Sequence, residues 1–445
     1  GNGCDVLTIP HNGNLSKGQL YVVPENENTA AYARLRSFWE PLSEIHQGKG
    51  SSECRTGVGT GDPECGFEQL KAQDLSFATG STTTDPDQGT DRDQDKRADR
   101  FRPKSFLRNV LKDGLVHEAR VGANPFKLGF VGGTDSHNAT PGGTDEVNFV
   151  GLHGTTSAGP EGLLTQVAFN AGGLAVVWAE ENSRDAIFDA MRRRETYATS
   201  GTRPIVRFFA GWDLPRDLCG QTDFARVGYD RGVPMGSDLK PRPAGAAGSP
   251  RFAVMAMKDP GSEGASDAFP NVCTVHHAAA KLQRIEIVKG WLDAKGVPRE
   301  KVITVAGGAD PAATVDPVTC APVGPGHNSL CNVWEDPEWN PAQPAFYYAR
   351  VLENPTCRWS TYACKQIGLD PFRHDQCMQQ LAKYSDALPR STPAVPTPQK
   401  PSDLFAPCCN MVPGPVVRPT QIPRVAQQRA WTSPVWYRPQ AGGRE

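Results

Sequence analysis

The chain has 445 residues, of which 38% are hydrophobic, and its formal net charge is −2. This near-neutral balance argues against nucleic acid or an anionic membrane surface as a partner. No apolar run approaches the roughly 20 residues of a membrane-spanning helix, so we expect no membrane span, and the length allows about two or three domains.

The first predicted element is a buried strand over residues 4–10, and His11 and Asn12 follow its carboxyl end. A helix is expected over 29–39, and a second strand over 42–46 leads to Lys49 and Glu53. Residues 54–100 are interpreted as an insertion. Its Gly-, Thr- and Asp-rich part, 79–99, has almost no apolar residues and is expected to be a solvated loop.

A long helix is predicted over 103–121, because its apolar residues recur on one face. A short apolar run then ends in two glycines and is followed by Asp135 and His137. If the run is a strand, side chains two positions apart point the same way. An imidazole and a carboxylate that converge are suitable ligands for one divalent metal. The alternative for an isolated Asp-x-His is a turn with a surface histidine.

Further elements are expected as a helix over 161–170, a strand over 174–179 and a helix over 184–194. This alternation of strands and helices predicts parallel strand pairing. His11, Lys49 and the Asp135–His137 pair each follow the carboxyl end of a predicted strand, which is the face where α/β folds build their sites.

From residue 204 the pattern changes to alternating strands, which indicates a β-rich, sandwich-like region over 204–445. Strands are expected over 205–212, 252–257, 284–289, 300–305, 345–353 and 433–437. A Cys- and Pro-rich insertion interrupts this region at about 357–425.

The chain has 12 cysteines, mostly in loop-like stretches and without zinc-finger spacing. We interpret them as disulfide-forming, which implies an oxidising compartment, periplasmic or extracellular. The pairs expected from short loop closure are Cys54 with Cys65 and Cys320 with Cys331.

Several motifs occur in one order along the chain: Ile9-Pro10-His11-Asn12-Gly13-Asn14, Gly132-Gly133-Thr134-Asp135-Ser136-His137, Glu195-Thr196-Tyr197-Ala198-Thr199-Ser200-Gly201 and Val288-Lys289-Gly290-Trp291-Leu292-Asp293. With them the chain resembles a large bacterial family of PHP-like proteins, related to the polymerase-and-histidinol-phosphatase metallohydrolases. The resemblance implies that residues 1–203 are the C-terminal part of a distorted (β/α)7 barrel, an α/β fold, and that the β-rich domain follows.

The resemblance also implies a cluster of up to three divalent metals, usually zinc, manganese or iron. His11, Asp135 and His137 match metal ligands of that family, and Asp135 would also accept a proton. The opening His-x-His, the next histidine and the bridging glutamate have no counterpart here. We therefore expect a missing N-terminal segment, or a second polypeptide, to carry the remaining ligands.

Four further residues are candidates for binding a small anionic substrate. Lys49 can hold an anion, although a lysine in a Gly/Ser loop is more often solvated. Glu53 either shares this face or only pairs with Lys49. Asn12, like His46, is a candidate for supporting a metal ligand, and Arg203 either contacts an anion or forms a salt bridge at a domain junction.

The expected function is that of a metal-dependent hydrolase that cleaves a phosphoester, or a similar small anionic ester, with metal-activated water. A sulfate-ester or amide hydrolase is the alternative among enzymes. The alternative from another class is a non-catalytic, disulfide-stapled extracellular binding module.

Overall fold

The computed structural model describes residues 5–16, 18–69, 103–152, 159–164, 166–167, 169–243, 248–261, 279–384, 401–412 and 422–439. Cys4, the predicted loop over 79–99 and part of the Cys- and Pro-rich insertion lie outside these residues. The α-helices are α1 (Ala30–Trp39), α3 (Leu107–Val121), α4 (Gly159–Leu164), α5 (Arg184–Arg192), α6 (Phe224–Arg231), α7 (Trp359–Gln366), α8 (His374–Leu381) and α9 (Pro401–Cys409).

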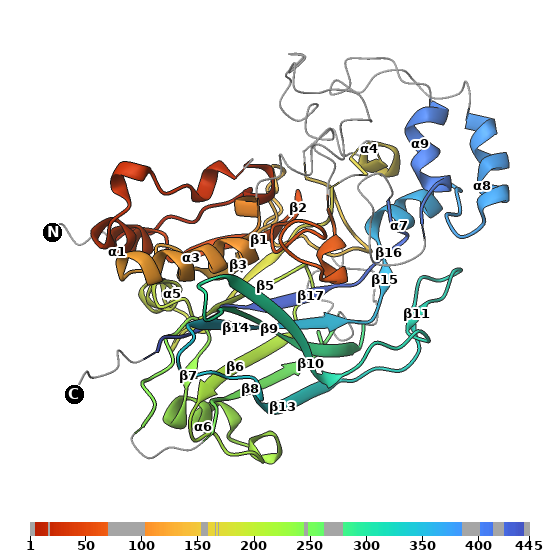
Figure 1. Ribbon diagram of the computed structural model, residues 1–445. Helices are drawn as coiled ribbons and strands as arrows, with labels where there is room; N and C mark the ends of the chain where they lie inside the picture. The colour runs from red at the N-terminus through yellow and green to blue at the C-terminus, as the bar shows by residue number, and fades with distance from the viewer. Residues whose placement is uncertain are drawn as a thin grey trace, which may run out of the picture.

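The strands form one large sheet and several smaller ones (Figure 1). The seven-stranded sheet has the order β10 (Pro298–Gly307), β9 (Leu282–Leu292), β14 (Ala345–Glu353), β17 (Arg429–Thr432), β5 (Thr196–Thr199) and β4 (Leu174–Val177), with β18 (Val435–Tyr437) also paired to β14. The four-stranded sheet has the order β13 (Ser329–Glu335), β8 (Arg251–Met257), β6 (Ile205–Gly211) and β7 (Val233–Pro234). The three-stranded sheet has the order β2 (Gly50–Ser51), β1 (Leu42–Gln47) and β3 (Gly129–Gly132). Two-stranded sheets pair β11 (Thr314–Val315) with β12 (Pro322–Val323) and β15 (Thr356–Cys357) with β16 (Val425–Ala426).

Strand β14 illustrates why the seven-stranded sheet is buried on both faces. Every residue of β14 is buried, and successive side chains alternate between two hydrophobic cores. Tyr347 and Val351 belong to the core shared with the four-stranded sheet, and Phe346 and Tyr348 belong to the core on the opposite face. Because both faces of the large sheet are apolar, each is covered. The four-stranded sheet lies on one face, below it in Figure 1, and helix α3 lies on the other.

The face opposite the four-stranded sheet is covered by α3 and by strands β1 and β3 (Figure 1). The predicted apolar stripe of α3 is buried as expected, since Leu107, Val110, Leu111 and Leu115 all lie in this core. The helix ends at Gly122, whose left-handed conformation (φ 82°) is the common helix terminator.

A third core lies under α4, α7, α8 and α9. The disulfides Cys364–Cys408 and Cys377–Cys409 fasten α9 to α7 and α8. Helices α7, α8 and α9 all lie within the Cys- and Pro-rich insertion that the sequence indicated at about 357–425.

Five disulfides link the described cysteines. The predicted Cys54–Cys65 pair is present. The predicted Cys320–Cys331 pair is wrong, because Cys331 pairs with Cys219 and Cys320 with Cys357. Short loop closure favours neighbours in sequence, but Cys331 lies on β13 in the four-stranded sheet, which brings it beside the turn that holds Cys219.

Three expectations about elements need correction. Residues 5–10 form no strand and stay partly exposed, although Pro10 accepts a hydrogen bond from the Glu44 amide (3.0 Å). Strand β4 pairs antiparallel with β5, so the alternation of strands and helices produced only one parallel pair among the described strands, β1 with β3. The helix expected over 161–170 is the shorter α4.

The described strands do not close into a barrel, and the PHP-like barrel stays a prediction. The boundary expected between 203 and 204 also stays a prediction. The seven-stranded sheet, however, takes β4 and β5 from one side of that boundary and its other strands from the other side. Among the described helices, none combines the length and the apolar character that crossing a membrane requires.

Candidate active site at the carboxyl ends of strands β1 and β3

The parallel pairing of β1 with β3 places the segments after these two strands side by side. His46 lies opposite Gly132, and the Gly133 amide donates to the His46 carbonyl at 3.0 Å. Gly132 also lets β3 approach β4 closely, because a Cβ on Gly132 would lie 2.7 Å from the Leu174 carbonyl oxygen. The loops that carry Lys49 and Asp135 therefore begin from one shared edge.

Asp135 and His137 form an adjacent pair, as the sequence predicted. His137 Nε2 lies 3.4 Å from Asp135 Oδ1, and both side chains are accessible, being 58% and 42% exposed. Asp135 adopts a left-handed conformation (φ 57°), which is rare outside glycine, asparagine and aspartate. The His137 amide is fixed by a 2.7 Å hydrogen bond to the Leu152 carbonyl. The pairing results from this turn after β3 and not from alternation along a strand.

Lys49 and Glu44 form a second pair next to the first. Lys49 is 2% exposed, and its Nζ lies 3.5 Å from Glu44 Oε1 and 2.7 Å from Ser52 Oγ. Burial lowers the pKa of Lys49 to about 8, while Glu44 and Asp135 oppose this shift. The lysine is thus within electrostatic reach of both carboxylates of the site.

Glu44 joins the N-terminal segment to this pair. Burial raises the pKa of the Glu44 carboxyl, and Lys49, the Asn12 amide and His11 each lower it in part. The Asn12 amide donates to Glu44 Oε1 at 3.4 Å, and Asn12 Oδ1 accepts a hydrogen bond from Gln47 at 2.9 Å. These contacts hold His11, which is exposed, over the carboxyl end of β1.

The predicted metal ligands are close but do not form a compact trio. Within the described ranges, one set of three His, Cys, Asp or Glu residues has its ligand atoms within 4.8 Å of one another: Cys54, Asp62 and Cys65. That set is not a metal site, because Cys54 and Cys65 form a disulfide and have no thiolate to offer. The ligand atoms of His11, Asp135 and His137 therefore do not all lie within 4.8 Å of one another, and the role of His11 as a ligand stays a prediction.

Glu53 does not lie on this face, and its assignment there was wrong. It is 2% exposed and accepts hydrogen bonds from Arg108 (2.5 Å), Tyr348 (2.7 Å) and Trp431 (2.7 Å). Although burial raises its pKa, Arg350 and Arg108 outweigh burial and hold the pKa of Glu53 well below its usual range. A carboxylate fixed in the charged state in this way is structural.

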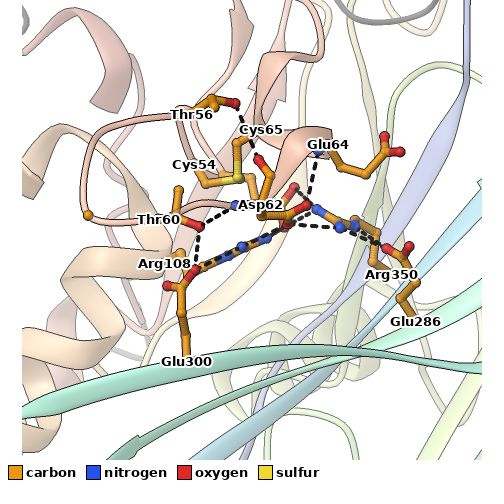
Figure 2. Close-up of polar contacts among 12 residues, drawn as sticks. Cys54, Thr56, Thr60, Asp62, Glu64, Cys65, Arg108, Glu286, Glu300 and Arg350 are labelled. Carbon is orange, nitrogen blue, oxygen red and sulfur yellow. Dashed lines mark hydrogen bonds and ion pairs between the residues drawn. A yellow bond between two sulfur atoms is a disulfide. The ribbon is translucent and has the colours of Figure 1, made fainter.

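A larger charge network lies between the Cys54–Cys65 loop and the seven-stranded sheet, and Figure 2 shows its part around Asp62. Glu53 belongs to this network through Arg108 and Arg350. Asp62, on that loop, lies 2.9 Å from both Arg108 and Arg350. Arg350 also lies 2.7 Å from Glu286. Since these carboxylates are each bridged by arginine, the network anchors the loop and offers no proton acceptor.

Two other candidates lie elsewhere. Arg203 is exposed, its backbone amide donates to Asp259 (2.7 Å), and its guanidinium donates to the Gly142 carbonyl (3.3 Å). Neither contact is the salt bridge of the junction alternative, and the binding of an anion by Arg203 stays a prediction. His46 is buried, with its ring stacked on Phe67 at 5.5 Å between centroids. Burial lowers the pKa of His46 to about 3, with Lys49 and Arg429 adding to the effect, so the ring is neutral.

Sequence reasoning missed Glu44. The available signal was a carboxylate between Leu42 and Ile45 in a predicted strand that precedes the Gly- and Ser-rich segment carrying Lys49. A charged residue in a buried strand is rarely tolerated without a partner, and here the partner is Lys49.

Comparisons with known proteins give one result. A family model described as "Protein of unknown function (DUF3604)" matches residues 1–388. Neither a curated protein nor a solved structure matches the chain.

Proposed function

The chain belongs to the DUF3604 family, and from that premise we propose that it is a metal-dependent hydrolase of the PHP-like class, acting on a phosphoester or a similar small anionic ester. The observation that carries the proposal is the grouping of Asp135, His137 and Lys49, which follow two parallel strands, with Glu44 of β1. Ligands in open α/β folds bind at this end of the strands.

The donor set suits a divalent cation such as zinc, manganese or iron. Asp135 and His137 supply a carboxylate and an imidazole 3.4 Å apart, and both are accessible to an ion from solvent. His11 and Glu44 flank them and are the next candidate ligands. A bound metal would act as a Lewis acid toward water and toward the ester oxygens. Ligands from a segment outside the described residues would complete the set.

The residues of this chain would divide the remaining work. Asp135 accepts a proton from the attacking water, since its carboxylate is exposed to the site. Lys49, with a pKa of about 8, is mostly protonated at neutral pH and places a positive charge behind Glu44. Asn12 and Gln47 position the segment that carries His11.

The test measures metal content and hydrolysis on the protein as its gene encodes it. We expect near-stoichiometric zinc, manganese or iron by elemental analysis, and turnover of aryl phosphomonoesters or phosphodiesters. The double variant Asp135→Asn, His137→Ala should lose most of the metal and at least about 100-fold in kcat/KM.

The matched control is the double variant Asp185→Asn, His327→Ala, which removes the same side-chain types at exposed positions outside the site. It should keep both the metal and the turnover. Full metal content in the Asp135 and His137 variant would overturn the proposed ligands. Turnover of sulfate esters or amides, but not of phosphoesters, would instead assign the other hydrolase chemistry to the same residues.

A non-catalytic binding module is the second candidate, because His11, Asp135 and His137 do not converge within 4.8 Å. A protein that holds no metal and turns over none of these esters would support it. For both proposed functions we place the protein outside the cytosol, in the periplasm or the extracellular space, because disulfides persist in oxidising compartments.

A further inference from the structure

A basic pocket lies at the other end of strands β1 and β3. This cavity of about 440 Å³ is lined by Arg34, Phe38, Asn124, Lys127, Arg192, Arg194, Glu118, Arg438 and four smaller residues. Pro41 immediately precedes β1, and Lys127 lies two residues before β3, so the pocket opens at the amino ends of the strands. It is therefore distinct from the candidate active site at their carboxyl ends.

The lining of the basic pocket carries five cationic side chains and one carboxylate. Three of the cations have an acidic partner: Arg438 pairs with Glu118, Arg192 with Asp5 (2.8 Å), and Lys127 with Asp238 (2.5 Å). In the part of the chain that the structure describes, Arg34 and Arg194 have no carboxylate within 4 Å. The pocket therefore holds an excess of two positive charges.

Arg194 is fixed at the wall of the basic pocket by tight backbone packing. Its backbone is left-handed (φ 64°), a conformation that is costly for a residue with a Cβ. A Cβ on Gly129 would lie 2.8 Å from the Arg194 Cβ, and one on Gly236 would lie 2.1 Å from its carbonyl oxygen. The guanidinium Nε donates to the Gly236 carbonyl at 2.9 Å. Burial lowers the pKa of Arg194, and the charge of Asp238 opposes this shift in part. Because Asp238 is already paired with Lys127 at 2.5 Å, a ligand that supplies negative charge would stabilise the desolvated Arg194 guanidinium.

Asn124 adds an independent sign of a ligand. Its side chain is 5% exposed, and its Oδ1 accepts the Phe126 amide at 2.8 Å. Its Nδ2 is buried and, among the described residues, has no hydrogen-bond acceptor. Buried amide donors are normally satisfied, so this residue of the pocket lining has hydrogen-bonding capacity that the described residues do not use.

We propose that the basic pocket binds a tetrahedral oxyanion, a phosphate or sulfate group carried by a small organic molecule. Guanidinium forks match such oxyanions with paired hydrogen bonds. Phe38 is 51% exposed and lies under Arg192 at 4.6 Å, which gives the organic part an apolar wall. The cavity exceeds the size of a free anion, so an ester fits better than inorganic phosphate. This proposal does not depend on the hydrolase activity.

The test is calorimetric titration of the protein with inorganic phosphate, inorganic sulfate and phenylphosphonate, which has no hydrolysable ester bond. We expect saturable binding that weakens with added salt, and tighter binding of phenylphosphonate than of the free anions. Arg194→Gln and Arg34→Gln should each weaken binding at least about tenfold, a change of about 1.4 kcal/mol. Arg34 lies on the exposed surface of α1, so its variant tests the proposal even if the Arg194 variant fails to fold.

Two controls locate the binding. Arg226→Gln removes an exposed arginine on α6, far in sequence from the pocket residues, and should leave the affinity unchanged. The Asp135→Asn, His137→Ala variant should also bind normally, which separates this pocket from the candidate active site. The proposal is overturned if phenylphosphonate does not saturate by about 10 mM, or if Arg34→Gln and Arg194→Gln both bind like the unmodified protein.

Discussion

Glu53 is the residue on which the buried charge network depends. It contacts Arg108 at 2.5 Å and Arg350 at 3.2 Å, and both arginines are completely buried. Without Glu53, Arg108 would lose its nearest counter-charge inside the fold, and Arg350 would lose one of its carboxylate partners. Removing one partner of a buried ion pair is far more costly than removing a surface pair.

The first prediction is therefore that Glu53→Gln lowers the free energy of unfolding by about 3–5 kcal/mol. Urea denaturation followed by tryptophan fluorescence measures this change, since Trp431 donates to Glu53 at 2.7 Å. Glu338→Gln removes the exposed partner of Lys301 and should cost less than about 1 kcal/mol. Equal losses in the two variants would contradict the structural role of Glu53.

Glu353 is the opposite case, a buried carboxyl with little compensation. It is completely buried, and Thr202 and Lys258 offset the effect of burial only in part. Burial raises its pKa to about 8, and Asp259 adds to the rise. The folded state therefore keeps the proton over a range of pH in which the unfolded chain releases it.

The second prediction concerns pH. The protonated Glu353 carboxyl contributes fully to the free energy of unfolding below the ordinary Glu pKa. This contribution is lost as the pH rises toward 8, at up to about 1.4 kcal/mol per pH unit. Glu353→Gln removes this titration, so the variant should gain stability relative to the unmodified protein as pH rises. Urea midpoints at about pH 5, 6.5 and 8 measure it. Parallel curves for the two proteins would disprove the prediction.

At the residue scale, the sequence predicted what was local. Asp135 and His137 are two positions apart, so their contact could be predicted from the order of the residues. The role of Glu53 was not predictable, because Arg350 lies 297 residues away in sequence. Glu44 lay within reach of sequence reasoning, but its partner Lys49 reads as a solvated residue until burial is known.

Strand β3 shows at the element scale how closely this fold packs its backbones. A Cβ on Gly132 would lie 2.7 Å from the Leu174 carbonyl oxygen, 2.9 Å from the Leu174 amide nitrogen and 3.0 Å from the Thr199 carbonyl oxygen. These are backbone atoms of β4 and β5, so no side-chain rotation can relieve the contact. The glycine is what lets the parallel β1–β3 pair sit against the large sheet.

The third prediction is that Gly132→Ala destabilises the fold by at least about 1–3 kcal/mol, the usual cost of overpacking. It should also displace the loop that carries Asp135, so metal content should fall together with stability. Gly308→Ala adds the same methyl group where nothing lies within 4 Å and should leave the urea midpoint unchanged within error. A stable Gly132→Ala protein would show that β3 is packed less closely than described.

Helices and strands were predicted correctly where their hydrophobic periodicity was strong. The prediction failed where a strand's place depends on strands far away in the sequence. The α3 stripe and the strands of the β-rich region have clear periods, and the structure has elements at these places. The direction of β4 was wrong because a strand's partner depends on the whole sheet and not on its neighbours in sequence. Residues 5–10 have the composition of a strand, but they lie outside every sheet.

At the scale of the whole molecule, disulfides tie together distant parts of the chain. Cys219 and Cys331 are separated by 112 residues and join the 3-10 helix Leu218–Gly220 to β13. A cross-link over so long a loop stabilises mainly by restricting the unfolded chain.

The fourth prediction is that Cys219→Ser with Cys331→Ser lowers the free energy of unfolding by about 4 kcal/mol. The slope of the urea dependence should rise, because the unfolded chain expands when the cross-link is lost. As a control, titration of free thiols in the unfolded variant checks that the other four described disulfides are still formed. An unchanged slope would mean that this disulfide does not restrict the unfolded chain.

The position of β17 has a consequence for biosynthesis. This strand lies between β14 and β5, and the Arg429 amide that donates to Ser200 is 229 residues further along the chain. At typical translation speeds, β5 emerges from the ribosome roughly ten to forty seconds before its neighbour does. During that interval one side of β5 has no hydrogen-bonding partner and invites association with other nascent chains. The insertion of β17 then joins β5 to β14 and makes the large sheet continuous between them.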